Sequence, residues 1–231
     1  MTSKWLDEEF VWRWDQTILT GNPMRSEQID LLLSILETTC KPDATVLDVG
    51  MGSGQIEEQL LRRMPKATVV GVDFSRPMLD LAARRLGEFR DRIKLIEHDY
   101  NDLRSLDLAP GGFDAGICFD VIHHAREAKK SEMFKYFFDG LVRGGLLFYG
   151  DKVVVDADNF GGVYKAAWER LENRSVVKSG WDGERYLDHV KKHTGHSMDI
   201  AAQIALVQST GFLCSCLYLH LDRALFVCKK T

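Results

Sequence analysis

The sequence predicts an α/β protein in which a mostly parallel sheet is covered by helices on both faces. Short apolar strand patterns alternate with amphipathic helix patterns from residue 44 to residue 151. The strand patterns are apolar almost without interruption, which is typical of parallel strands buried on both sides. A glycine-rich turn joins the first of these strands to the helix that follows it. We therefore predict a Rossmann-like three-layer sandwich.

The elements follow one another with short connections. A helix over 26–39 places apolar residues at 29, 32, 33 and 36 on one face, and Ser26 is its expected N-cap. Ser75, followed by Pro77, is the expected cap of a later helix. The remaining predictions in this region are strands at 44–50, 67–74, 92–99, 113–122 and 144–151, and helices at 54–64, 75–89 and 129–141.

The pattern changes after residue 150. Segment 156–194 is polar and aromatic, and we predict a helical insertion over the sheet. Ser197 is the expected cap of a helix that reaches about Thr210. Residues 211–230 read as two strands in a hairpin, which makes a seven-stranded sheet with an antiparallel last strand. No Pro/Gly/Ser linker is present, so we predict one domain over 1–231, with 1–40 as an N-terminal helical cover.

Charge and composition narrow the possible partners. The chain has 231 residues and a net charge of −4, whereas nucleic-acid binders are more often basic. No apolar run approaches membrane-spanning length and the first residues lack a signal-peptide core, so we expect no membrane partner and a cytoplasmic location. A homodimer is left open.

Metal binding is not expected. The five cysteines are an odd number without a Cys-x-x-Cys pair, which argues against a disulfide framework and a zinc site. His189, His193 and His196 have a spacing that metal ligands use, but the lysine pair between the first two disfavours a cation.

The turn "TVLDVGMGSGQ" indicates where a ligand binds and what charge it carries. Asp48 precedes Gly50, Gly52 and Gly54 at the carboxyl end of the first parallel strand, and open parallel sheets bind ligands at that edge. The dinucleotide fingerprint is G-x-G-x-x-G, whereas this turn reads G-x-G-x-G. A carboxylate beside the turn would repel a pyrophosphate. It suits a ligand that carries an ammonium and a sulfonium group.

These motifs, in this order, resemble the class I S-adenosylmethionine-dependent methyltransferases. "LDVGMGSG" is similar to their first motif. Asp73 in "VVGVDFS" matches the acid that ends their second strand, and it follows Gly54 by 19 residues, as a ribose-binding acid does. Asp99 in "IEHDYNDL" matches an acid that meets the adenine amino group in the family. The resemblance covers residues 45–150 and implies S-adenosylmethionine as cofactor and S-adenosylhomocysteine as product.

Further cofactor candidates surround these motifs. Phe74 matches an apolar residue that packs on the adenine, and an aromatic ring suits that role. Asp120 is expected near the methionine portion and Arg25 near its carboxylate. Met78, Tyr100 and Phe119 are expected to line the same pocket.

His123 and His124 are the candidate catalytic residues. They follow the fourth predicted strand, at the edge where the methyl group should emerge. A base is needed only if the acceptor keeps its proton at neutral pH, and histidine titrates in that range. The resemblance also allows a packing role for one of the pair, and we prefer His124 as the base.

Aromatic residues outside the motifs are candidates for the acceptor site. They are Trp14 near the N-terminus and Tyr164, Trp168 and Trp181 in the predicted insertion. Packing in a core or a lid explains their spacing equally well.

Several functions remain open. The first is methyl transfer to a small-molecule substrate. The second follows a loose likeness of "ILTGNPMRSEQIDLLLSIL", "GDKVVVD" and "KSGWDGERYL" to carboxy-S-adenosylmethionine synthases of tRNA modification, which needs a cation such as Arg25 or Lys178. The third is a cofactor-binding regulatory module without catalysis. A nicotinamide oxidoreductase is disfavoured by Asp48 and by the glycine spacing.

Overall fold

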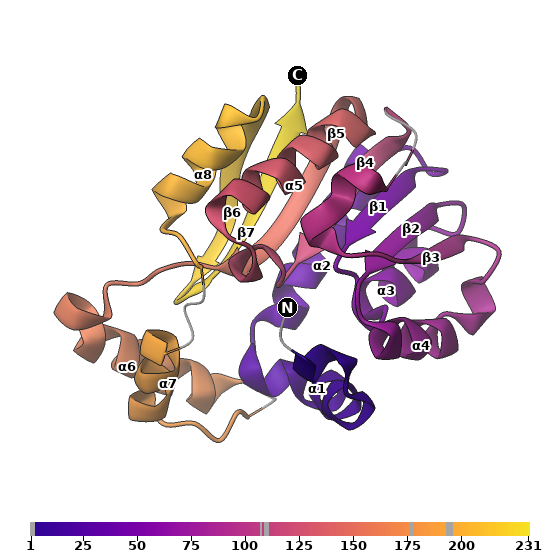
Figure 1. The fold of residues 1–231 in the computed structure, drawn as a ribbon. Coiled ribbons are helices and arrows are strands. Elements are labelled where there is room, and N and C mark those ends of the chain that lie inside the picture. The colour runs from indigo at the N-terminus through magenta and orange to yellow at the C-terminus, as the bar shows by residue number, and fades with distance from the viewer. Residues whose placement is uncertain (1–2, 107, 109–110, 176–177, 193–195) are drawn as a thin grey trace.

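The computed structural model describes residues 3–106, 108, 111–175, 178–192 and 196–231 (Figure 1). A seven-stranded sheet with the order β3-β2-β1-β4-β5-β7-β6 forms its centre. Neighbouring strands run parallel except β7, which is antiparallel to both β5 and β6. The predicted architecture, including its antiparallel last strand, is confirmed.

The strands lie close to their predicted positions. They are β1 (Thr45–Val49), β2 (Thr68–Asp73), β3 (Ile93–Glu97), β4 (Phe113–Phe119), β5 (Leu141–Lys152), β6 (Phe212–His220) and β7 (Arg223–Lys230).

The described helices alternate with the strands and extend beyond them at both ends of the chain. The α-helices are α1 (Glu8–Gly21), α2 (Arg25–Thr39), α3 (Gln55–Arg63), α4 (Arg76–Arg85), α5 (Glu127–Gly140), α6 (Ala157–Arg174), α7 (Gly183–Lys192) and α8 (Ile200–Ser209). Four short 3₁₀ helices are η1 (Ser3–Leu6), η2 (Gly87–Phe89), η3 (Tyr100–Ser105) and η4 (Ile122–His124). None of the described helices is long and apolar enough to cross a membrane.

Each face of the sheet carries its own hydrophobic core. On one face, α2, α3 and α4 pack through side chains such as Leu32 and Leu60. On the other face, α5, α8 and η3 pack through side chains such as Phe134, Phe137 and Val207 (Figure 1). Because both faces are covered, the inner strands have no polar side, which explains their unbroken apolar patterns.

Two predicted helix caps are wrong. Helix α2 begins at Arg25 with Met24 in the cap position and without a side-chain cap, so Ser26 lies inside the helix. Helix α8 is capped by Asp199, whose carboxylate accepts from the N–H of Ala202. In both helices the observed cap position lies two residues from the predicted one, which is the usual uncertainty of a helix boundary. Ser75 does cap α4, by accepting from the N–H of Met78.

The helices outside the alternating pattern gather beside the carboxyl ends of the parallel strands. Helix α1 lies below β1, and α6 and α7 lie near the carboxyl end of β5 and the start of β7 (Figure 1). In the α6–α7 pair, Trp168 stacks on Tyr186 with ring centroids 4.4 Å apart. The Tyr186 hydroxyl donates to Asp222 Oδ1 at 3.0 Å, which ties the pair to the β6–β7 turn. The single-domain organisation stays a prediction.

Two carboxyl groups meet in the core behind the glycine turn. Asp48 of β1 is 1% exposed and Glu57 of α3 is 0% exposed. Among the described residues, Asp48 Oδ1 and both oxygens of Glu57 have no donor. Burial, and then the neighbouring carboxyl of Glu57, raise the pKa of Asp48 well above its usual range, and burial raises the pKa of Glu57. A proton shared between the two carboxyls would satisfy both groups.

This pairing changes the role expected of Asp48. A shared proton leaves less negative charge at the turn than a free carboxylate would. The repulsion that Asp48 exerts on a polyanion is therefore weaker than the sequence alone suggests.

The paired carboxyls make stability depend on pH. Their raised pKa values favour the folded protein below the unfolded pKa of about 4, and this contribution is lost as pH rises through the folded values. Glu57→Gln supplies an amide donor to Asp48 and removes one titrating group. Relative to the native protein, we expect its melting temperature to gain about 2–4 °C more at pH 8 than at pH 5.

The control is Glu37→Gln, which removes the same charge from an exposed position on α2. Melting curves of the three proteins at both pH values test the expectation. Equal shifts of Glu57→Gln at pH 5 and pH 8 would contradict a shared proton.

Candidate cofactor and acceptor site

The glycine turn adopts a backbone conformation that leaves part of its backbone uncovered by side chains. Gly50 has φ of 82° and Gly52 has φ of 61°. The N–H of Gly50 donates to the carbonyl of Val72 at 2.7 Å, which holds the turn on β2. A β-carbon at Gly50 would lie 2.2 Å from Val121 Cγ2, so a larger residue does not fit. At Gly52 a β-carbon would find only Met78 Sδ, at 3.9 Å, and would project into a cavity.

That cavity lies where the sequence places the cofactor. Its empty volume is about 490 Å³. Gly50 and Gly52 line it, together with the rings of Phe74, Tyr100 and Phe119. The ring centroids of Phe74 and Tyr100 are 5.8 Å apart in an edge-to-face arrangement. These surfaces form a slot with apolar walls beside an open backbone.

Polar side chains occupy other parts of the same cavity. Asp73, Asp120 and His124 line it, as do the predicted residues Met78 and Trp14. Ten of the sequence candidates therefore line one cavity, although they come from five separate segments of the chain. Their individual roles stay predictions.

Asp73 lines the cavity and keeps unused hydrogen-bond acceptor capacity for a ligand. Its Oδ2 accepts from the N–H of Gly52 at 2.8 Å, and its Oδ1 accepts from the N–H of Ser75 at 2.8 Å. A carboxylate offers about four acceptor sites, so roughly two remain for the cavity. Burial raises the pKa of Asp73 to about 6 although backbone N–H groups oppose the shift. The same carboxylate thus holds the turn and can accept further hydrogen bonds.

Arg25 does not line the cavity, because it is paired with Asp120. Its Nη1 lies 2.5 Å from Asp120 Oδ2, and Arg223 Nη1 lies 3.2 Å from Asp120 Oδ1. Arg25 also lies over the Phe119 ring, at 4.9 Å from the centroid. Burial opposes ionisation of Asp120, but the two arginines outweigh it and lower its pKa. Asp120 therefore presents a fixed carboxylate to the cavity.

The backbone at Asp120 is also unusual. Its φ of 58° lies in the left-handed region, which non-glycine residues rarely adopt. Such conformations persist where surrounding contacts enforce them, and they concentrate at functional sites. The two arginines supply such contacts here.

Three further cofactor candidates lie outside the cavity lining. Asp48 is buried behind the turn in its pair with Glu57. Gly54 occupies the cap position of α3 with φ of 80°. Asp99 caps η3, since its Oδ1 accepts from the N–H of Asn101 at 2.8 Å and from its side-chain amide at 2.9 Å. The contacts of these three residues within the chain support a structural role.

The two adjacent histidines have different environments. His123 is buried, and Asp151 accepts from its N–H at 2.7 Å and contacts its Nδ1 at 2.5 Å. His124 lines the cavity, and its ring lies 6.4 Å from the ring of Trp5. Only His124 of the pair is therefore placed to meet a ligand.

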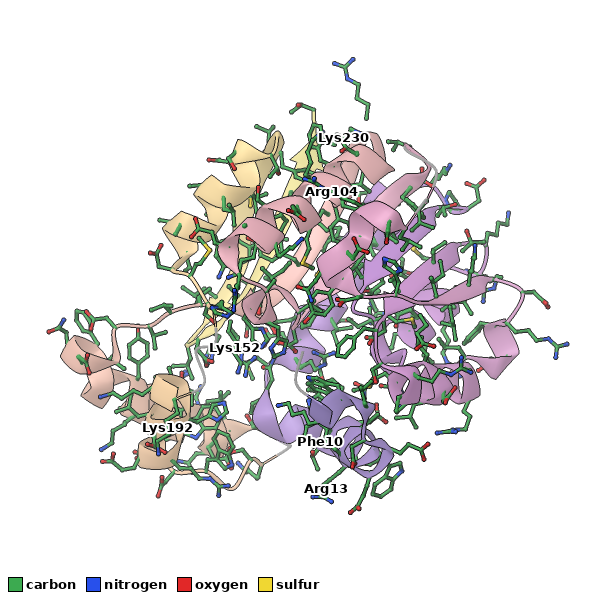
Figure 2. All side chains as sticks on the ribbon, viewed as in Figure 1. Phe10, Arg13, Arg104, Lys152, Lys192 and Lys230 are labelled. Atoms are coloured by element: carbon green, nitrogen blue, oxygen red, sulfur yellow. The ribbon has the colours of Figure 1, made fainter. Side chains whose placement is uncertain are left out.

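The ring of His124 is uncharged at neutral pH. Partial burial, then His123 and the nearby Lys152 and Lys4, lower the pKa of His124 to about 4. Lys152 is the last residue of β5, and it lies between the sheet and the helices α6 and α7 (Figure 2). A neutral imidazole can accept a proton, although its low pKa makes it a weak base.

The N-terminal segment lies over the cavity, and its Trp5 is a lining residue that sequence reasoning missed. Trp5 of η1 lines the cavity, and its carbonyl accepts from the Ser75 hydroxyl at 2.5 Å. Asp15 of α1 accepts from Gln55 Nε2 at 2.7 Å and pairs with Arg85 Nη2 at 2.8 Å. These contacts fix η1 and α1 over the glycine turn. The three tryptophans among the first fourteen residues were the available signal.

The aromatic residues of the 156–194 region lie elsewhere. Trp168 is buried against Tyr186, and its indole N–H donates to the carbonyl of Trp181 at 3.0 Å. Tyr164 packs against the same cluster. Neither tryptophan lines the cofactor cavity, so these contacts support core packing and not an acceptor cage.

Metal ligation has no support in the described part of the chain. His189 of α7 packs on Trp181 with ring centroids 4.8 Å apart. His193 lies outside the described residues. Among the residues that the structure describes, no three His, Cys, Asp or Glu side chains are grouped as metal ligands.

A second, wider cleft opens beside the cofactor cavity. Trp5, Phe74, Tyr100 and His124 line both spaces. The cleft continues to Asn101, Arg126, Lys129 and His196, with an empty volume of about 990 Å³. A ligand in the cleft would reach the cavity past the four shared side chains.

The residues of the cavity fit an adenosyl cofactor. The backbone at Gly52 is uncovered toward the cavity, Asp73 keeps acceptor capacity for ribose hydroxyls, and Phe74 supplies an apolar ring. The carboxylate of Asp120 suits an ammonium group. This donor and acceptor set matches a nucleoside that carries positive charge.

Comparisons with known proteins agree with this site. Residues 46–145 match a methyltransferase domain family. The chain is 21% identical over 150 residues to the carboxy-S-adenosyl-L-methionine synthase of Nautilia profundicola, covering 65% of this chain and 62% of that protein. It is 46% identical over 82 residues to the ribosomal RNA small subunit methyltransferase H of Kineococcus radiotolerans, covering 35% of this chain and 21% of that protein. The chain thus spans less than two thirds of the length of these relatives.

Solved structures share the fold. Human N-acetylserotonin methyltransferase in complex with S-adenosylmethionine superimposes with a TM-score of 0.65 at 16% identity, over 97% of this chain and 56% of that chain. Magnesium protoporphyrin IX methyltransferase from Synechocystis PCC 6803 with bound S-adenosylmethionine gives a TM-score of 0.60 at 14% identity, over 90% of this chain and 80% of that chain. The chain is thus similar to a methyltransferase domain over residues 46–145, and it shares its fold with methyltransferases that bind S-adenosylmethionine.

Proposed function

We propose that this protein transfers the methyl group of S-adenosylmethionine to a small-molecule acceptor. The observation that carries the proposal is the continuity of the two spaces beside the glycine turn. One space has the residues for an adenosyl cofactor, and it shares Trp5, Phe74, Tyr100 and His124 with the wider cleft. An acceptor in that cleft would approach the cofactor from one direction.

The chain contributes orientation and exclusion of water. When bound, S-adenosylmethionine supplies a methyl group that its positive sulfur has already activated. Asp73 and the open turn orient the nucleoside, and Asp120 faces the positive end of the ligand. Trp5 and Trp14 shield the cavity from solvent.

The neutral His124 sets a limit on the acceptor. A weak base removes a proton readily only from an acidic group. An acceptor that is already deprotonated, or that has a free lone pair, needs no base. An acidic acceptor, or one that needs no base, therefore suits the environment of His124.

A carboxy-S-adenosylmethionine synthase-like activity is the second candidate. The supporting observation is the 26% identity over 150 residues to the synthase of Campylobacter hominis. Against it, Arg25 is committed to Asp120 and does not line the cavity. Mass spectrometry of the ligand that copurifies with the protein separates the two candidates. An added carboxyl group on the cofactor would favour the synthase.

A cytoplasmic location, a homodimer and the absence of nucleic-acid partners stay predictions. The net charge of −4 supports the last of these.

Ligand-induced thermal stabilisation tests the cofactor assignment. We expect S-adenosylmethionine and S-adenosylhomocysteine at 100 times their dissociation constants to stabilise the fold by about 2.7 kcal/mol, and NAD to have no effect. With a labelled methyl donor, a metabolite extract should then yield a labelled product. Tight cofactor binding without any labelled product would instead favour a regulatory module.

The raised pKa of Asp73 predicts how cofactor binding depends on pH. Ribose hydroxyls donate to the ionised carboxylate, so affinity for S-adenosylhomocysteine should fall by up to about tenfold per pH unit below the pKa of about 6. In the unliganded protein, the effect of rising pH on folding stability is opposite to its effect on ligand affinity. The stability that Asp73 contributes is present below the unfolded pKa of about 4 and is lost as pH rises through about 6.

Asp73→Asn is the variant for this prediction, because it cannot ionise and keeps one acceptor oxygen for the turn. Titration calorimetry between pH 5 and pH 8 should give weaker binding that no longer changes across this window. A native protein with pH-independent affinity would refute the assignment of Asp73 to the ribose.

A further inference from the structure

The cleft beside the cofactor cavity is chemically asymmetric. On the side shared with the cavity, the rings of Trp5, Phe74 and Tyr100 line it. On the other side it is lined by Arg126, Lys129 and other nitrogen-bearing side chains. None of its eight lining residues is an acid.

Arg126 brings a positive charge that no acid in the described chain neutralises. It is exposed and occupies the cap position of α5, where its side chain makes no cap hydrogen bond to the described residues. Among the described residues its guanidinium has no ion pair within 4.0 Å. A guanidinium presents paired N–H groups that match a carboxylate or a phosphate.

Lys129 lies one turn further along α5. Its Nζ lies 2.9 Å from Glu132 Oε2, and both side chains of this pair are partly exposed. Such surface pairs contribute little and exchange readily. Lys129 can therefore leave Glu132 and bind an anion in the cleft with little loss of free energy.

Other cleft residues add hydrogen-bond donors. The backbone of His196 is held in place, because its N–H donates to the carbonyl of His123 at 3.0 Å and its own carbonyl accepts from Lys130 Nζ. Burial, then Asp99 and Asp73, raise the pKa of Tyr100 to about 12, so its hydroxyl keeps a proton to donate.

The acids near the cleft are on the cofactor side or engaged elsewhere. Asp73 and Asp120 line the cofactor cavity. Asp99 accepts from Asn101, and Asp102 accepts from the Ser105 hydroxyl at 2.8 Å. Carboxylates thus line the cofactor cavity, whereas Arg126 and Lys129, the second paired with Glu132, line the outer cleft.

We propose that the acceptor is a flat molecule that bears an anionic oxygen group, a carboxylate or a phosphate. Arg126 and Lys129 bind this group, and the ring lies against the aromatic side of the cleft. The proposal rests on the methyltransferase function proposed above, since it assigns the acceptor of the same site. It selects anionic acceptors over neutral and cationic ones of the same shape.

Binding of matched probes tests the charge preference directly. With S-adenosylhomocysteine bound, titration calorimetry compares 3,4-dihydroxybenzoate, its uncharged amide, 3,4-dihydroxybenzylamine and phenyl phosphate. We expect the anionic probes to bind at least about tenfold more tightly than the amide, and the amine to bind most weakly. Whether 3,4-dihydroxybenzoate or phenyl phosphate binds more tightly identifies which anion the cleft prefers.

Variants assign the preference to the cleft. Arg126→Gln combined with Lys129→Gln should bind the anions and the amide equally, whereas Arg126→Lys should keep part of the difference. The control combines Arg90→Gln with Lys66→Gln, which removes the same charge from exposed positions before β3 and β2. This control should bind all probes as the native protein does.

Several outcomes would overturn the proposal. The first is that the native protein binds the benzoate and its amide equally tightly. The second is that the double variant still prefers the anions. The third is that no anionic probe binds at about 5 mM. If S-adenosylhomocysteine stabilises the protein in these cases and a labelled methyl donor still yields a labelled product, the methyltransferase function stands and only the acceptor assignment fails. If S-adenosylhomocysteine does not bind, the proposed function itself fails.

Discussion

The site depends on the bend of the backbone where β1 ends. Gly50 and Gly52 have positive φ, and the first of these amides is held by the carbonyl of Val72. Asp73 holds the second from the end of the neighbouring strand. The bend is thus fixed by two parallel strands at once, and it leaves a strip of backbone without side chains beside a carboxylate.

Charge around this bend is arranged by pairing. Asp48 shares its surroundings with Glu57, and Asp120 lies between Arg25 and Arg223. The first pair lowers negative charge inside the core, whereas the second fixes a carboxylate at the cavity wall. The carboxylate that faces a positive ligand is therefore Asp120 or Asp73, and not the acid that precedes the glycines. Buried charges need such partners because their desolvation is costly.

The acceptor side is built from segments that are remote in the sequence. Trp5 comes from the first turn of the chain, Tyr100 follows β3, Arg126 begins α5, and His196 precedes α8. The polar contacts of Ser75 with Trp5, and of Lys130 with His196, hold two of these segments against the central sheet. The central sheet and its turns therefore supply the cofactor side, and peripheral segments determine the chemistry of the cleft.

The sequence by itself determined the alternation of strands and helices, the reversed last strand and ten of the residues that line the cofactor cavity. These follow from local patterns, because apolar periodicity and glycine positions constrain the backbone near them. Only the tertiary structure decided that Arg25 pairs with Asp120, that Asp48 meets Glu57, and that Trp168 packs on Tyr186 away from the cavity. Each of these contacts joins side chains from two different elements of the fold. Which side chains meet across such distances is set by how the elements pack, and no local pattern encodes it.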